Sequence, residues 1–173
     1  MSILRYGLVV FVVGLGQIAC ATTSWNNRIV ETAGALEISA AQLQASMSAA
    51  KYVVVGEKHY TPSVQAVEGQ LMQLWVASRA GQKLGFGWEF LAHTEQSKNF
   101  ALWQEVINGK STVDDFLKAT QGKSGPVYSP VLNVALQNKI ELFGLNLTRA
   151  QKGPVAKSGI GALDPVLIPN GYQ

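Results

Sequence analysis

Glu57 and His59 place a carboxylate and an imidazole two residues apart, directly after the apolar run at residues 52–55. Side chains at this spacing on a strand point the same way, and past the end of the strand they can still converge on one ligand. Such a pair suits metal binding, acid–base chemistry or a hydrogen bond to a cofactor propionate. The alternative is a loop pair in which Glu57 caps a helix and His59 orders the turn.

Two later apolar segments also end in polar side chains, because Glu89 follows the second and Asn146 follows the third. In open α/β folds, ligands bind where parallel strands end, since the loops there have no packing role and the next helix offers its positive end. A carboxylate is costly to bury alone, and His59 would give Glu89 a partner. The sequence therefore predicts that all four polar side chains share one rim of a sheet.

Helix signals separate these apolar segments. Ser39 followed by Gln42 has the capping-box spacing, Thr61 before Pro62 is a typical helix start, and Thr112 is a further cap. The resulting β-α-β-α-α-α-β order implies right-handed crossovers. We therefore expect an α/β fold whose parallel sheet carries helices on both faces, with helical patterns over residues 39–50, 62–81, 95–106, 113–120 and 130–136.

The composition indicates one folded domain. The chain has 173 residues, of which 47% are hydrophobic and 14% charged, which argues against disorder. Its formal net charge of +3 comes from scattered lysines and arginines rather than from a basic stripe. We therefore expect no nucleic-acid partner.

Residues 1–20 form a separate compositional unit, with Arg5 ahead of a mostly apolar run, the layout of a secretory signal. The run is short for a membrane span. It ends at Cys20, the only cysteine, in a context that looks like a bacterial lipoprotein cleavage site, although Gln17 stands where that motif prefers Leu. An ordinary signal peptide with an incidental cysteine is the alternative.

The sequence thus predicts three parts: an exported signal over residues 1–20, a tether over residues 21–37 and one domain over residues 38–173. We expect lipidation at Cys20 and anchoring at the bacterial outer membrane or in the periplasm. A lone cysteine excludes a disulfide within the chain.

Other kinds of site find less support. A catalytic zinc usually has three protein ligands, and only Glu57, His59, Glu89 and His93 lie near one another in the predicted fold, so we predict no dedicated metal site; His93 is interpreted as a solvated loop residue. No Gly-x-Ser-x-Gly elbow or complete dinucleotide fingerprint occurs.

Two tyrosines are candidates for ligating iron. Tyr60 follows His59 on the predicted rim, and Tyr128 begins the helix before the third strand. A phenolate can ligate ferric iron in haem. The alternative for both is an amphipathic ring, half-buried at a helix start with its hydroxyl in water.

Taken together, these motifs resemble the ChaN family of haem-binding uptake lipoproteins, within the wider Tiki and erythromycin-esterase-like group. The resemblance covers about residues 38–163 and rests on the order and spacing of residues 53–59, 88–90, 96, 128–132 and 140–146. It implies a Rossmann-like parallel α/β fold and haem binding in iron acquisition. The chain ends soon after the third strand, whereas the family usually continues, so we expect an incomplete sheet with an open edge that invites either self-pairing into a homodimer or instability.

The resemblance also assigns residues. The family's Gly-Glu-x-His motif maps onto Gly56, Glu57 and His59, and its second acidic position onto Glu89. Haem ligation by tyrosine maps to Tyr128, with Tyr60 as second choice. Together with Asn146 on the predicted rim, these residues are the candidate haem-binding set.

Three functions remain open. The leading hypothesis is a non-enzymatic haem-binding lipoprotein that takes part in iron or haem uptake. The alternative is a hydrolase of the esterase or Tiki-protease type, in which Glu57, His59 and Glu89 activate a water, directly or through a divalent metal. The third is a degenerate fragment without activity of its own.

Overall fold

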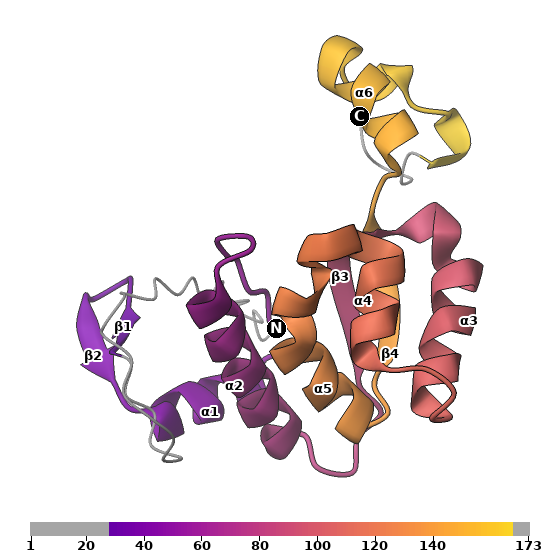
Figure 1. Cartoon of the computed structure of the whole chain (residues 1–173). Helices are drawn as coiled ribbons and strands as arrows, with labels where there is room; N and C mark the ends of the chain where they lie inside the picture. Colours follow the sequence, from indigo (N-terminus) through magenta and orange to yellow (C-terminus); the bar gives the residue numbers. More distant parts are fainter. Residues whose placement is uncertain (1–27, 168–173) are drawn as a thin grey trace. The chain divides into compact units, whose positions relative to one another are not determined.

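The computed structural model describes residues 28–167 (Figure 1). These residues divide into two compact units. Unit 1 comprises residues 28–84 and 126–138, and unit 2 comprises residues 85–125 and 139–167. The predicted signal and Cys20 lie outside the described residues. Among the helices of residues 28–167, none is both long and apolar enough to cross a membrane.

Unit 1 is mainly helical. An antiparallel hairpin of two short strands leads into two successive helices. A third helix joins the unit after the chain has passed through residues 85–125 of unit 2. These elements are β1 (Ile29–Glu31), β2 (Leu36–Ile38), α1 (Ala40–Ala49), α2 (Pro62–Ser78) and α5 (Ser129–Gln137). The hairpin occupies residues at the end of the segment that the sequence predicted to be a tether.

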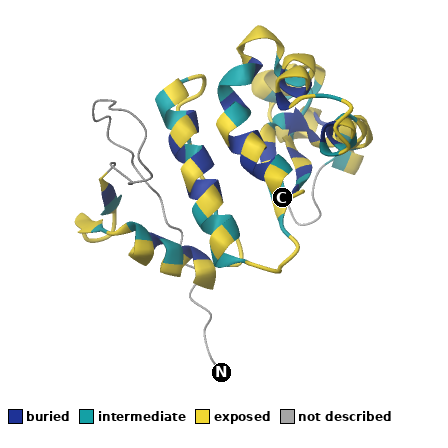
Figure 2. Ribbon diagram, turned by 60° about the horizontal axis from the view of Figure 1, so that its bottom comes forward, coloured by how far each residue is buried: buried dark blue, intermediate teal, exposed yellow. Residues whose placement is uncertain are grey.

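Apolar stripes hold unit 1 together. Buried positions alternate with exposed ones along the helices, as expected for amphipathic segments (Figure 2). Helix α2 packs against both α1 and α5. At Gly69 a Cβ atom would lie 3.0 Å from the Pro130 carbonyl oxygen, so the glycine permits a close helix contact. The core cluster consists of Ile29, Leu43, Met47, Val67 and Leu71.

Local capping signals in the sequence are confirmed in part. Ser39 and Gln42 form the predicted capping box at α1, and Pro62 occupies the start of α2. Thr61 makes no side-chain cap. Its hydroxyl instead donates to the carbonyl oxygen of His59 at 3.3 Å, so this threonine braces the turn before the helix.

Unit 2 contains the parallel sheet. Strands β3 (Gly85–Ala92) and β4 (Glu141–Asn146) pair in parallel, with α3 (Gln96–Ile107) and α4 (Val113–Gln121) packed against them. Short 3-10 turns and one more helix complete the described chain: η1 (His93–Glu95), η2 (Gly122–Tyr128, leading into α5), α6 (Arg149–Ser158), η3 (Ile160–Ala162) and η4 (Pro165–Leu167). The mixed α/β class and the parallel pairing are confirmed.

Helix α3 binds the backbone of β4 through side chains. The Gln96 amide donates to the Leu142 carbonyl and accepts from the Gly144 N–H, both at 2.8 Å. The Trp103 indole donates to the Ile140 carbonyl at 2.9 Å and stacks edge-on against Phe116. Gln96 thereby occupies two backbone groups that a neighbouring strand would otherwise bind.

The predicted first strand is wrong. Residues 52–55 carry no regular secondary structure, and Tyr52 and Val54 are 72% and 69% exposed. The parallel sheet of the described residues therefore has two strands rather than three. The physical reason is that an apolar run favours burial, whereas a strand also needs a partner whose backbone completes the ladder, and that partner is not encoded locally.

The predicted end of the second strand is also wrong. Strand β3 continues past Glu89 to Ala92, and its register with β4 shifts between Trp88 and Ala92, so that Ala92 rather than Glu89 pairs with Asn146. Glu89 therefore lies within the strand and is exposed. The apolar residues Phe90 and Leu91 extend the strand beyond the carboxylate.

Close packing of β3 on β4 gives a stability test. A Cβ atom at Gly144 would lie 2.6 Å from the Ala92 carbonyl carbon and oxygen. Because this is rigid backbone, Gly144→Ala should lower the free energy of unfolding by about 1–3 kcal/mol in urea titrations of the full chain.

Gly87→Ala is the matched control in the same sheet. The three atoms nearest to its Cβ would all belong to the exposed Leu145 side chain, which can rotate away, so the change should stay within about 0.5 kcal/mol. Equal losses in the two variants would contradict the described register.

Candidate functional site

The candidate site is a turn between the 52–55 segment and helix α2. Glu57, His59 and Tyr60 lie on this turn, and Tyr60 adopts a left-handed backbone with φ of 55°. That conformation is uncommon for a residue with a side chain and costs backbone energy. The hydroxyl of Tyr128, from the start of α5, accepts the Tyr60 N–H at 3.3 Å and helps to hold the turn in this shape.

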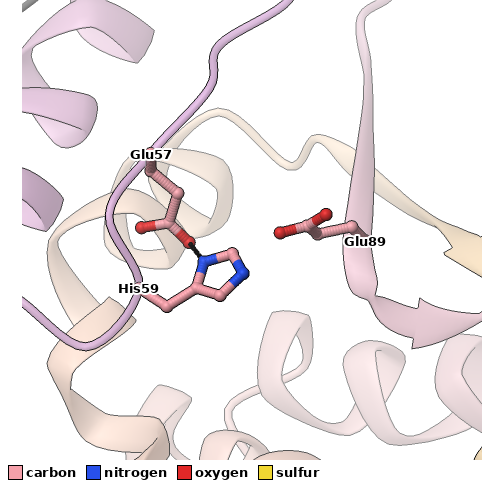
Figure 3. Close-up of side chains that lie close together, drawn as sticks. All are labelled: Glu57, His59 and Glu89. Atoms are coloured by element: carbon pink, nitrogen blue, oxygen red, sulfur yellow. Dashed lines mark hydrogen bonds and ion pairs between the residues drawn. The ribbon is translucent and has the colours of Figure 1, made fainter.

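The carboxylate of Glu57 is the centre of the site. Only 9% of its side chain is exposed. Its Oε1 accepts from His59 Nδ1 at 2.9 Å (Figure 3) and from the Tyr128 hydroxyl at 3.1 Å. Its Oε2 accepts from Gln65 Nε2. Three donors thus compensate the desolvation of one charge.

The hydrogen bond to Glu57 fixes the tautomer of His59. A carboxylate can only accept, so Nδ1 carries the proton, and in the neutral ring Nε2 carries the lone pair. The His59 side chain is half-exposed, at 49%. Metal-binding histidines adopt this arrangement, in which one ring nitrogen donates to a carboxylate and the other binds the metal.

The two candidate tyrosines differ in access. Tyr60 is 49% exposed, and its ring makes edge contacts with His59 at 6.2 Å and with Tyr128 at 5.7 Å between centroids. Tyr128 is 1% exposed. Burial raises the pKa of the Tyr128 phenol, the nearby Glu57 carboxylate raises it further, and the Tyr60 N–H offsets part of the rise.

Gln65 is the residue that sequence reasoning missed. It lies in the first turns of α2, is fully buried, and donates through Nε2 to Glu57 and to the Lys58 carbonyl. A glutamine in a helix normally indicates an exposed position. The available signal is its spacing from Gly69 and Met72, which places it on the buried face of the helix.

The remaining predicted residues lie in unit 2. Glu89 projects from β3 (Figure 3). Asn146 ends β4, where its Oδ1 accepts from the Leu147 N–H at 2.9 Å and its carbonyl oxygen is 3.4 Å from His93 Nδ1. The structure thus brings Glu57, His59, Tyr60 and Tyr128 together within unit 1. That Glu89 and Asn146 share this site stays a prediction, and the divalent metal of the hydrolase alternative stays a hypothesis.

The buried phenol gives a pH test. Because the folded state holds the Tyr128 proton more tightly than the unfolded chain, stability is intact below the ordinary tyrosine pKa of about 10 and falls as pH rises above it. Absorbance titration of the five tyrosines should show one that ionises last. Tyr128→Phe should remove that step, whereas Tyr52→Phe, at an exposed position, is the matched control and should leave it in place. A last step that survives Tyr128→Phe would contradict this environment.

Comparison with known proteins identifies the family of the chain. The family described as haem-binding uptake, Tiki superfamily, ChaN matches residues 43–170, which is most of the chain. A search of curated proteins and a search of solved structures found no match. The matched range contains the whole Glu57 site and both strands of the parallel sheet. The chain therefore belongs to the ChaN family of the Tiki superfamily.

Proposed function

We propose that this protein binds haem in iron or haem uptake, and that Nε2 of His59 ligates the iron. Membership of a haem-binding uptake family supports the cofactor. The single observation that supports the ligand is the hydrogen bond from His59 Nδ1 to the buried Glu57 carboxylate. Haem iron in proteins is commonly held by a histidine, and a carboxylate on the far ring nitrogen orients that ligand and raises its basicity.

The donor set of the turn fits haem. The imidazole of His59 and the phenol of Tyr60 are both half-exposed and adjacent, and either group can ligate ferric iron. Bound haem supplies the iron and its redox chemistry. The chain supplies an oriented nitrogen at His59 and an aromatic surface at Tyr60.

Tyr128 fits ligation poorly in this arrangement. Its hydroxyl already accepts from the Tyr60 N–H and donates to Glu57. The bond donated to Glu57 would have to break, and the phenol would have to lose its proton despite a raised pKa, before iron could bind there. Among the tyrosines that the resemblance indicates, the structure therefore favours Tyr60.

Hemin titration of the purified full chain, followed by Soret absorbance, tests the proposal. His59→Ala should weaken hemin affinity by at least about tenfold, since loss of a ligand costs no less than loss of the residue that hydrogen-bonds to that ligand. His93→Ala is the matched control, because the chain has two histidines, and it should bind hemin like the wild type.

Tyr60→Phe separates the two candidate ligands, with Tyr52→Phe as its control. Retained affinity and an unchanged spectrum in Tyr60→Phe support His59. A lost or shifted Soret band in Tyr60→Phe, with His59→Ala unaffected, would assign the iron to the phenolate. Wild-type behaviour of both variants would remove this turn as the haem site.

The proposal also includes an exported protein, anchored by a lipid at Cys20 in the outer membrane or periplasm. Its support is the composition of residues 1–20 and the small polar residues after the cysteine. Cys20→Ser should abolish incorporation of labelled palmitate and release the protein from the membrane fraction. Gln17→Leu, which restores the preferred residue, should speed processing. A wild-type protein that incorporates no palmitate, or a Cys20→Ser protein that stays in the membrane fraction like the wild type, would contradict the anchor.

A further inference from the structure

We propose that Gln65 and Tyr128 are positioning residues that lock the Glu57 carboxylate and thereby hold His59 as its Nδ1–H tautomer. The inference rests on the proposed function, because Nε2 is then the atom offered to haem iron. Gln65 acts through Glu57 from helix α2, and Tyr128 does so from the position just before α5. Neither is assigned a role in ligation.

The Glu57 carboxylate is held at both oxygens. Oε1 accepts from His59 and from Tyr128, and Oε2 accepts from Gln65. Rotation of the carboxylate about its own axis would break bonds at both oxygens. Because Gln65 and Tyr128 are fully buried, water cannot readily replace them as donors. The direction in which Glu57 presents Oε1 to the imidazole is therefore set by these two side chains.

The orientation of the Gln65 amide is determined by its neighbours. Its Nε2 faces two acceptors, the Glu57 carboxylate and the Lys58 carbonyl oxygen at 3.2 Å. The reversed amide would place Oε1 against both of them. In the adopted orientation Oε1 is buried and has no hydrogen-bond partner among the described residues. A buried acceptor without a donor costs stability. The Gln65 side chain therefore adopts the orientation that gives Glu57 a donor, although its own Oε1 is left without a hydrogen bond.

The direction of the Tyr128 hydroxyl proton follows by elimination. The Tyr60 N–H is a donor, so the hydroxyl must accept from it, and the hydroxyl proton goes to the Glu57 carboxylate at 3.1 Å. The Tyr128 hydroxyl thus links the Tyr60 N–H, after His59 in the chain, to the Glu57 carboxylate, before it. This fixes the distance between the two ends of the turn on which His59 lies.

Nitrogen NMR of the apo protein tests the inference without haem. In a ¹⁵N-labelled full chain carrying His93→Gln, His59 is the sole imidazole. At mildly alkaline pH we expect a pyrrole-type shift at Nδ1 and a pyridine-type shift at Nε2. Tyr128→Phe and Gln65→Leu should each move both shifts towards the mixed tautomers of an exposed imidazole, and the double variant should move them further.

Matched variants separate positioning from general loosening. Tyr52→Phe and Gln73→Leu, at exposed positions, should leave the His59 shifts unchanged. Circular dichroism verifies that each variant is folded. If Gln65→Leu or Tyr128→Phe does not fold, Glu57→Gln keeps the shape of the acceptor and removes its charge, and it should also mix the tautomers. Wild-type His59 shifts in folded Gln65→Leu, Tyr128→Phe or Glu57→Gln would overturn the inference.

Hemin affinity gives a second readout. The two positioning variants should bind hemin up to about tenfold more weakly, since loss of the residue that bonds directly to a ligand costs about 10–100-fold and both side chains act one step further away, through Glu57. Altered tautomers with unchanged affinity would overturn the link between positioning and ligation. If the wild type fails to bind hemin at all, the proposed function fails, while the tautomer result in the apo protein still decides the role of Gln65 and Tyr128.

Discussion

The structure of the candidate site depends on one buried charge. With 9% of its side chain exposed, Glu57 requires donors from the protein. Three side chains supply them, from the turn itself, from α2 and from α5. The same bonds connect segments that are distant in sequence. Removing a donor would leave the buried carboxylate with too few hydrogen bonds, which costs free energy. The turn therefore keeps the shape in which all three donors reach Glu57, and in this shape the rings of His59 and Tyr60 are exposed.

In unit 2, backbone packing and side-chain hydrogen bonds from a helix stabilise the parallel pair of strands. Gly144 allows the backbones of β3 and β4 to approach, and Gln96 binds the β4 backbone as a neighbouring strand would. A two-stranded sheet is marginal by itself. Its stability in unit 2 therefore rests on α3, through Gln96 and the buried Trp103, rather than on further strands among the described residues. The predicted homodimer through an open edge stays a prediction.

Local features were predictable from the sequence, and non-local ones were not. The capping box at Ser39 and the cap at Thr112 are confirmed because a cap is defined within four residues. The strand expected at residues 52–55 is wrong because ladder partners come from elsewhere in the chain. Tyr128 was expected to be half-exposed or a ligand, but it is buried because α5 packs on α2, a contact that only the fold creates. The Glu-x-His pair was found from spacing, whereas its donor Gln65 was hidden in a helical pattern.

The central claim is that Glu57 orients His59 so that its Nε2 meets the haem iron. Electron–nuclear double resonance on the ferric-haem complex, prepared with ¹⁵N-histidine in the His93→Gln chain, tests it most directly, because only a nitrogen bonded to the iron couples strongly to its electron spin. We predict a strong ¹⁵N coupling from a single imidazole. A haem complex that shows no such coupling would contradict the account.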